Sequence, residues 1–354
     1  MYSGFLAYLT YMDRFGLPCA GVIHVGANHA AEAREYDAYG KVPVAFFEPV
    51  PAVYEKAVKA TAPFPNQRVF HACCADVDGR EVTFNVSSNA GASSSMFPLG
   101  RHAQVTPGVT YVDSIALKTC RVETILKEHY RLDDFNLAVI DTQGADFLVL
   151  KGFGRFIDYI DAIYIEVSDT PLYEGGATFD EIYRYLNDLD YSLSMLETNN
   201  ADWGNAFFKR RQPVYVRETV NAVSKGKPVT QSSTLSGWKP EYGNDGDIIH
   251  RRKFFHTKKE ESPWWKVDLE LSTAIKKVYL YDCPGQTERA KSLVVEVSED
   301  NQTWLKIHDR AGAIVKAGAA VISWRGRARY VRVRLAEQNY LQLRQVAVIE
   351  DEFA

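Results

Sequence analysis

Val22-Ile23-His24-Val25-Gly26-Ala27-Asn28 is the stretch that decides the fold of the first half of this chain. The apolar run predicts a buried strand that ends at Gly26, where a residue without a Cβ lets the chain turn sharply and lets the backbone approach a ligand. A helix is predicted from about His29 to Tyr39. A second apolar strand, Ala45-Phe46-Phe47-Glu48-Pro49, follows it. Strand, glycine turn, helix and strand indicate an α/β domain with a parallel sheet.

The acid at the end of the second strand indicates a nucleoside cofactor. Glu48 follows the glycine turn by about 20 residues, where a carboxylate accepts hydrogen bonds from a ribose diol. Dinucleotide-binding folds also need Gly-x-Gly-x-x-Gly to admit a pyrophosphate, and residues 26–31 read Gly-Ala-Asn-His-Ala-Ala. S-adenosylmethionine carries no phosphate and makes no such demand. The stretch alone leaves open an ordinary buried strand with a glycine turn.

Two later segments also end buried strands in acids. Residues 136–153 read Asn-Leu-Ala-Val-Ile-Asp-Thr-Gln-Gly-Ala-Asp-Phe-Leu-Val-Leu-Lys-Gly-Phe, and residues 160–168 read Ile-Asp-Ala-Ile-Tyr-Ile-Glu-Val-Ser. With the two earlier blocks, the region from about residue 18 to residue 210 resembles the FkbM family of S-adenosylmethionine-dependent methyltransferases. The resemblance implies a Rossmann-like α/β methyltransferase domain, doubly wound with a mostly parallel sheet. It departs from the family pattern at His24, where Asp is usual, and at Asp146, where Glu is usual.

The resemblance and the strand ends suggest site residues. The expected contacts to S-adenosylmethionine are His24, Gly26, Ala27, Asn28, Glu48, Pro49, Asp141 and Gln143. Methyl transfer needs an aligned acceptor hydroxyl and a group that takes its proton. Asp141 and Glu166, at neighbouring strand ends, are the candidates for this base or for orienting the acceptor, with His102 in a loop as a third. Helix capping is the alternative role of each acid, and for Asp146 it has equal weight with substrate binding.

A polar loop over residues 85–96, Asn-Val-Ser-Ser-Asn-Ala-Gly-Ala-Ser-Ser-Ser-Met, precedes these segments. Loops of this length often carry ligand contacts, and the family places a similar serine-rich loop here. Asn89, Ser94 and Ser95 are therefore candidates to line the cofactor or acceptor entrance. A loop that is merely flexible is the alternative.

The pattern changes near Arg210-Arg211-Gln212-Pro213, beyond which short strands and polar turns replace alternating helices and strands. With 354 residues, two domains are expected: a methyltransferase domain over 1–212, a linker over 213–222 and a β-domain over 223–354. Lys-Pro-Val-Thr-Gln-Ser-Ser at 227–233, Trp264-Trp265 and the alternating run 330–335 resemble the discoidin or galactose-binding-like family, most closely its fucose-binding lectin branch. The resemblance implies an all-β jelly-roll sandwich.

The ligand of this second domain stays open in the sequence. The lectin branch holds its sugar with two arginines, and this chain matches only one of them, Arg289. Arg289 is therefore a candidate substrate contact. Asn244, Asp245 and Asp247 offer the hard oxygen ligands that Ca²⁺ prefers, but an Asp-Gly turn also forms without a metal. Trp264 and Trp265 are expected to pack in the core rather than to form a sugar platform.

Composition limits the partners. A net charge of −4 and a pI near 6.1 argue against a nucleic-acid binder. Five cysteines show neither zinc spacing nor a disulfide framework, which suits a reducing compartment. No run reaches the about 18–20 apolar residues of a membrane span, and residues 1–12 lack the basic head of a signal peptide. A cytoplasmic protein is expected, with membrane-edge association left open.

Together these features predict an S-adenosylmethionine-dependent O-methyltransferase that acts on a carbohydrate hydroxyl, in a surface glycan or its precursor. Three alternatives stay open. One is a glycan-binding scaffold whose methyltransferase half is inactive, suggested by His24 and Asp146. The others are an O-methyltransferase of a small molecule such as a polyketide, and, well behind, an NAD-dependent oxidoreductase. The oligomeric state is not predicted.

Overall fold

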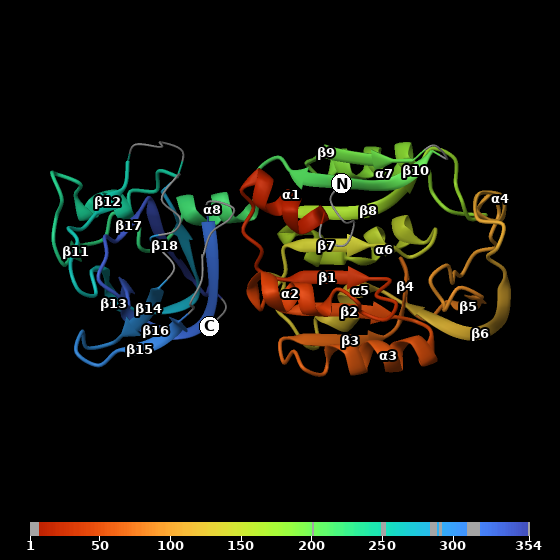
Figure 1. Ribbon diagram of the computed structural model, residues 1–354, viewed down its shortest axis with the longest axis horizontal. Coiled ribbons are helices and arrows are strands. Elements are labelled where there is room, and N and C mark those ends of the chain that lie inside the picture. Colours follow the sequence, from red (N-terminus) through yellow and green to blue (C-terminus); the bar gives the residue numbers. More distant parts are fainter. Residues whose placement is uncertain are drawn as a thin grey trace. The chain divides into compact units, whose positions relative to one another are not determined.

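The chain forms two compact units in the computed structural model (Figure 1). The first contains Met1–Leu9 and Cys19–Gln212, and the second contains Thr10–Pro18 and Pro213–Ala354. The segment expected to be a linker contains helix α8 (Val214–Val220) and belongs to the second unit. The structure describes residues 7–199, 202–248, 253–283, 289, 292–309 and 319–352.

A seven-stranded sheet forms the centre of the first unit, in the order β3-β2-β1-β7-β8-β10-β9. The first five strands of this order, β3, β2, β1, β7 and β8, run parallel, and β10 is antiparallel to both of its neighbours. The strands are β1 (Val22–Val25), β2 (Val44–Glu48), β3 (Gln67–His71), β7 (Leu137–Ile140), β8 (Ala162–Ser168), β9 (Tyr191–Thr198) and β10 (Trp203–Arg210). The predicted α/β fold with a mostly parallel sheet is confirmed.

Helices and a small second sheet surround the main sheet (Figure 1). The helices are α1 (Ala7–Phe15), which contains residues of both units, α2 (Ala33–Gly40), α3 (Pro51–Thr61), α4 (His102–Val105), α5 (Val122–Leu126), α6 (Asp146–Gly152), the 3-10 helix η2 (Gly154–Tyr159) and α7 (Phe179–Asp188). The small sheet has the order β4-β6-β5, with β4 (Cys73–Cys74), β5 (Glu81–Ser87) and β6 (Tyr111–Cys120). No helix of the described residues is long and apolar enough to cross a membrane.

The helix after the glycine turn starts later than the sequence predicts. It was expected from about His29, but α2 begins at Ala33. Asn28 and Ala30 have positive φ angles of 46° and 50°, which a right-handed helix does not contain. The glycine turn is therefore followed by an irregular segment and not directly by a helix N-terminus.

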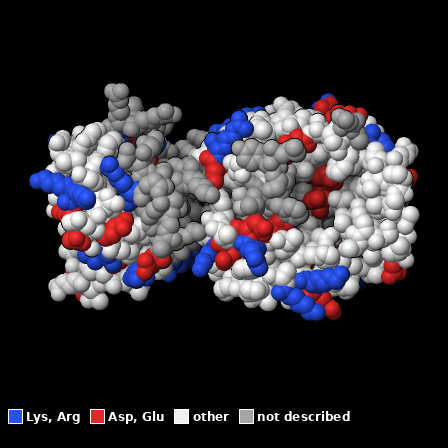
Figure 2. Space-filling view, in the orientation of Figure 1, with Lys and Arg blue, Asp and Glu red and all other residues white. Residues whose placement is uncertain are grey.

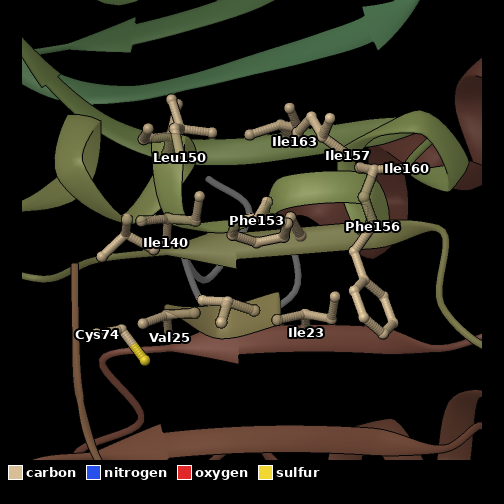
Figure 3. Close-up of a cluster of buried hydrophobic side chains, with 14 of the residues drawn as sticks. Ile23, Val25, Cys74, Ile140, Leu150, Phe153, Phe156, Ile157, Ile160 and Ile163 are labelled. Atoms are coloured by element: carbon tan, nitrogen blue, oxygen red, sulfur yellow. The ribbon is translucent and has the colours of Figure 1, made fainter. Parts of the chain in front are cut away.

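Apolar side chains from one face of the sheet make the main core (Figure 3). Ile23 and Val25 of β1, Ile140 of β7 and Ile163 of β8 pack with residues of α6 and η2 and with Phe153, which lies between these two helices. Because helices cover both faces of a parallel sheet, its strands read as nearly continuous apolar runs. This burial fixes the strand ends, where the polar residues lie.

The second unit is an antiparallel β-sandwich, as predicted. Its main sheet has the order β11-β13-β16-β14-β15, with β18 paired to β13, and β12 pairs with β17. The strands are β11 (Val229–Gln231), β12 (Phe255–His256), β13 (Trp264–Tyr281), β14 (Leu293–Ser298), β15 (Leu305–Asp309), β16 (Ala319–Leu335), β17 (Gln342–Leu343) and β18 (Gln345–Glu350). Trp265 is fully buried and stacks on Phe255, whereas Trp264 is half-buried.

Candidate active site

A pocket lies where the strand order of the first sheet reverses. Strands β1 and β7 are neighbours there, and the chain continues from them toward opposite edges of the sheet. Open α/β sheets bind ligands at this point, outside the carboxyl ends of the strands. The pocket has a volume of about 500 Å³. Its lining consists of Val25, Gly26, Asn28, Phe47, Glu48, Pro49, Ala72, Cys73, Cys74, Phe84, Gly91, Ala92, Ser94, Met96, Asp141, Thr142, Gln143 and Ala145.

Gly26 lines this pocket at the turn that follows β1. Its φ is +89°, and a Cβ at this position would lie 1.7 Å from the carbonyl oxygen of Asp141. The amides of Gly26 and Ala27 both donate to the carbonyl of Phe47, at 3.1 and 3.0 Å. The turn is therefore pressed against β2 and β7 at once, and only glycine fits.

Glu48 holds the next turn together from within the pocket. Its side chain is buried, and its two carboxylate oxygens accept the amides of Asn28 at 3.0 Å and Val50 at 2.8 Å. Desolvation raises the pKa of Glu48 to about 7, against the lowering effect of these two amides. Each oxygen keeps a second lone pair for a hydroxyl donor. The side-chain oxygen of Asn28 is buried without a partner, which leaves another acceptor at the pocket wall.

Asp141 ends β7 on the other side of the pocket, and its side chain is exposed there. The side-chain amide of Gln143 donates to Asp141 Oδ1. Protein atoms crowd this carboxyl and raise its pKa, although its surface opens on the pocket, and the amide of Gln143 acts in the opposite direction. The net effect is a raised pKa, and the hydrogen bond from Gln143 limits this rise by favouring the ionised form.

A second pocket of about 340 Å³ is lined by the residues that directly follow Gln143 in the chain and by residues at the end of β8. Its lining consists of Gly144, Asp146, Phe147, Glu166, Val167, Ser168, Pro171, Leu172, Tyr173, Gly176, Ala177 and Ile182. The structure thus separates two residues that the sequence analysis paired, because Asp141 lines the first pocket and Glu166 the second. In Figure 2, acidic side chains gather in a hollow of the first unit.

Glu166 has the environment of a proton acceptor. Burial raises its pKa well above the usual range, and the charges of Asp141 and Asp146 add to this. Its carboxyl has no hydrogen-bond partner within the described part of the chain. A raised pKa makes the carboxylate a stronger base, and its free lone pairs can accept a proton.

Asp146 is committed to the backbone. It accepts the amide and the hydroxyl of Thr142 at 2.7 and 3.0 Å on one oxygen and the amide of Gly144 at 3.1 Å on the other. Desolvation first, and then the charge of Asp141, raises the pKa of Asp146 to about 6. These donors precede α6 and no side-chain hydrogen bond caps that helix, so the predicted capping role is wrong, although Asp146 does lie in the first turn. Its carboxyl also belongs to the wall of the second pocket, so the predicted substrate contact stays open.

His24 is not brought into either pocket. Its ring is buried and packs 5.4 Å from Phe46, and Nδ1 lies 3.1 Å from the hydroxyl of Tyr36. Burial lowers its pKa to about 4, so the ring is neutral. Side chains alternate along a strand, and His24 points to the face opposite Ile23 and Val25. The predicted cofactor contact has no support in this placement.

The serine-rich loop is held in one conformation by its own side chains. Ser94 lines the first pocket and bonds the amide of Ser87, and Ser95 donates to the carbonyl of Gln143 at 2.7 Å. Asn89 is exposed and bonds Ser87 and Ser93 at 2.6 and 3.0 Å. Of the three predicted residues, only Ser94 lines a pocket, while Ser95 and Asn89 shape the loop.

His102 supports the site from outside the pockets. It is buried on α4, and its ring packs at a tilt against the ring of Tyr173, with centroids 5.1 Å apart. Nε2 lies 3.4 Å from the hydroxyl of Ser93, and burial lowers the pKa of the ring. It lines neither pocket, so its predicted catalytic role has no support in this geometry.

In the second unit, the predicted calcium ligands are engaged with protein groups. The amide nitrogen of Asn244 donates to the carbonyls of Ser224 and Lys227 at 2.7 and 2.9 Å. Asp245 Oδ2 pairs with the ammonium of Lys253 at 2.6 Å, and Asp245 Oδ1 accepts the amide of Asp247. A lysine thus supplies the cation at this turn. Among the described residues no group of three or more His, Cys, Asp or Glu is placed to hold a metal, so the structure gives the calcium prediction no support.

Arg289 is the remaining predicted contact. Its guanidinium donates to Gln342 at 3.1 Å and lies 5.0 Å from the ring of Tyr340. His256 also packs against Tyr340, edge-on, with ring centroids 5.5 Å apart. Residues 284–288, which precede Arg289, lie outside the described residues.

Residues 24–193 match the family model described as the Methyltransferase FkbM domain. The first unit carries an FkbM methyltransferase domain. Residues 228–346 match the model described as the F5/8 type C domain, so the chain joins an FkbM domain to an F5/8 type C domain.

Relatives of both domains are known. The 2-O-methyltransferase NoeI of Sinorhizobium fredii (strain NBRC 101917 / NGR234) is 27% identical over 161 residues, which are 44% of this chain and 65% of that relative. A fucose binding module of Streptococcus pneumoniae is 23% identical, with a TM-score of 0.34, and the match covers 37% of this chain and 95% of that one. The lectin domain of lectinolysin complexed with Lewis B antigen is 25% identical, with a TM-score of 0.34, and the match covers 37% and 96%.

The FkbM domain also contains pocket residues that the sequence analysis did not find. Cys73, Cys74, Phe84 and Met96 line the first pocket, and Tyr173 lines the second. None of these belongs to a strand end followed by a glycine turn, which was the signal used. The adjacent cysteines were visible in the sequence, but nothing in their spacing indicates a pocket wall.

Proposed function

We propose that this protein is an S-adenosylmethionine-dependent O-methyltransferase that acts on a carbohydrate hydroxyl, with the F5/8 type C domain as a carbohydrate-binding module. The observation that carries the proposal is the charge of the two pockets. Glu48 and Asp141 line the first and Asp146 and Glu166 the second, whereas no Lys or Arg is found among the described residues that line either one. Such pockets favour a ligand with positive charge.

The first pocket fits the cofactor. S-adenosylmethionine supplies an electrophilic methyl group on a positively charged sulfonium. Glu48 would accept the ribose hydroxyls, the unpartnered oxygen of Asn28 offers one more acceptor, and Asp141 would face positive charge. A dinucleotide would instead bring two negative phosphates to the same acids. Helix α2 begins seven residues beyond Gly26 and has Glu32 as its N-cap, so it offers no site for a pyrophosphate.

The second pocket supplies the acceptor side. Glu166 would take the proton of the attacking hydroxyl, since its raised pKa and free lone pairs suit this step. The wall combines the polar Ser168 with the rings of Phe147 and Tyr173, as binding a sugar ring requires. The 2-O-methyltransferase NoeI, with which the FkbM domain shares 27% identity, supports a hydroxyl oxygen as the acceptor. We further propose residues 1–212 and 223–354 as the working boundaries of the two domains.

The fusion to a second domain supports a glycan as the substrate. A tethered binding module raises the effective concentration of its ligand near the active site without any new contact in the pocket. A carbohydrate-binding module would do this for a glycan acceptor and would do nothing for an unrelated small molecule.

Titration of the purified protein with S-adenosylmethionine, S-adenosylhomocysteine and NAD tests the cofactor. Transfer of labelled methyl to a panel of free and polymeric sugars then tests the acceptor. Glu166→Gln should bind the cofactor normally and lose transfer, while Glu174→Gln, an exposed acid of the following loop, should retain both. Binding of NAD alone would contradict the proposal. Glycan binding without cofactor binding would favour the inactive scaffold.

A further inference from the structure

A chain of hydrogen bonds connects the two pockets. The hydroxyl of Tyr173, in the wall of the second pocket, donates to Gln143 Oε1 at 2.6 Å. The amide nitrogen of Gln143 donates to Asp141 Oδ1 in the first pocket. Gln143 therefore has a donor on one end of its side-chain amide and a carboxylate on the other.

Tyr173 and Asp141 together select one orientation of the Gln143 side-chain amide, with its oxygen toward Tyr173 and its NH₂ group toward Asp141. An amide can turn over and exchange its oxygen and its NH₂ group. If Gln143 turned, its oxygen would meet the negative carboxylate of Asp141. A phenol that donates to the oxygen holds the amide in the other orientation. Burial raises the pKa of Tyr173 well above its usual value, so the phenol keeps its proton and remains a donor.

The surroundings make this arrangement rigid. Gln143 has a positive φ of 55°, and its carbonyl accepts the hydroxyl of Ser95 at 2.7 Å. The next residue, Gly144, has φ of +100°, and a Cβ there would lie 2.7 Å from the Cβ of Tyr173. Tyr173 is almost completely buried and packs against the ring of His102. The phenol is thus fixed against Gly144 on one side and His102 on the other.

We propose that Tyr173 is a positioning residue that acts through Gln143 to orient the carboxylate of Asp141 toward the positively charged methyl donor. This inference rests on the proposed function, because it assigns Asp141 to the cofactor. It also gives the buried His102 a role, since its ring supports Tyr173 and touches neither pocket. The loop after β8 thereby connects the acceptor pocket to the donor pocket.

Other titratable groups also act on Asp141 and must be kept constant in a test. They are His24 on β1 and Glu32 before α2, together with Asp146 on α6 and Glu166 on β8, with which Asp141 interacts. A comparison of variants that leaves all four unchanged isolates the contribution of Gln143. Glu48, whose pKa is raised to about 7, titrates equally in every variant.

The test is a double-mutant cycle of Tyr173→Phe and Gln143→Met, read as the dissociation constant of S-adenosylmethionine at pH 6 and pH 8. Tyr173→Phe should weaken binding about threefold to tenfold, and more at the lower pH, because a looser hydrogen bond from Gln143 favours the protonated form of Asp141. In the Gln143→Met background it should add nothing, because its route to Asp141 is gone. Tyr191→Phe, which removes another buried hydroxyl, is the control and should leave binding unchanged.

An equal effect of Tyr173→Phe in both backgrounds, or no effect in either, would overturn the inference. A carbon-13 NMR titration of the unliganded protein, with Asp141→Asn to assign the signal, gives a readout that needs no cofactor. There, Tyr173→Phe should raise the titration midpoint of Asp141, and an unchanged midpoint counts against the hydrogen-bond chain. If the wild type fails to bind S-adenosylmethionine while this shift is seen, the proposed function fails and the chain of hydrogen bonds stands.

Discussion

Replacement of Glu48 gives the most direct test of the cofactor pocket. Glu48→Ala removes the carboxylate expected to accept two ribose hydroxyls. Hydrogen bonds to a charged acceptor contribute about 1.5 kcal/mol each at the low end of the usual range, so about 3 kcal/mol of binding free energy should be lost. At about 1.4 kcal/mol for each factor of ten, the dissociation constant of S-adenosylmethionine should rise about 100-fold.

The pKa of Glu48 adds a pH dependence to this prediction. A carboxyl whose pKa is about 7 is about one-tenth ionised at pH 6 and about nine-tenths ionised at pH 8. If the ionised form accepts the ribose hydroxyls, the wild type should bind about tenfold more tightly at pH 8 than at pH 6. Glu48→Gln cannot ionise and should lose most of this difference. It also places an NH₂ group against the amide of Asn28 or of Val50, so its binding should be weak at both pH values.

Isothermal titration calorimetry at the two pH values measures these effects. Glu55→Ala, which removes an exposed acid of α3, serves as the control and should behave as the wild type. Wild-type affinity for S-adenosylmethionine in Glu48→Ala would refute the assignment of Glu48 to the ribose. Affinity that is flat from pH 6 to pH 8 in the wild type would refute the raised pKa, or the requirement for an ionised carboxylate.

Three further predictions concern the turn, the base and the second domain. Gly26→Ala should prevent stable folding of the FkbM domain because its Cβ would meet the carbonyl of Asp141. Gly79 has a similar φ but no neighbouring atom where a Cβ would lie, so Gly79→Ala should lower the free energy of unfolding by only about 1–2 kcal/mol. Soluble yield and thermal melting compare the two variants. Glu166→Gln should reduce methyl transfer by at least about 100-fold with S-adenosylmethionine binding intact, and a comparable loss of binding would contradict its role as base. Neither millimolar calcium nor EDTA should shift the melting of the F5/8 type C domain, since Lys253 already pairs with Asp245; a clear shift in calorimetry would show a metal site.

The sequence predicts the parts of the site that depend on strand ends. Gly26, Glu48 and Asp141 each follow an apolar run directly, and strands that run parallel bring such ends to one edge of the sheet. All predicted cofactor residues except His24 and Ala27 line the first pocket. The sequence therefore indicates which residues line the pocket at the points where the chain leaves a strand.

The remaining parts depend on tertiary placement. His24 lies two residues before Gly26 but is still inside β1, so the alternation of the strand turns it into the core. Asp141 follows β7 and Glu166 lies near the end of the adjacent β8, yet the segment from Gln143 to Asp146 passes between their pockets and separates them. Tyr173 lies in a loop whose position follows from its packing on Gly144 and His102. Local pattern carries no information on such contacts.

The acids of the two pockets explain why a sulfonium suits this domain better than other nucleosides. Burial is the main cause that raises the pKa values of Glu166 and Asp146. The charge of Asp141 adds to both shifts and that of Asp146 adds to the first, so the ionised forms of these acids repel one another before any ligand binds. A cation among them relieves this repulsion. When the methyl group leaves, the sulfonium becomes a neutral sulfide and that relief ends. The electrostatic free energy that favours the methyl donor therefore no longer holds the product, which lets the same four carboxylates support both binding of the donor and release of the spent cofactor.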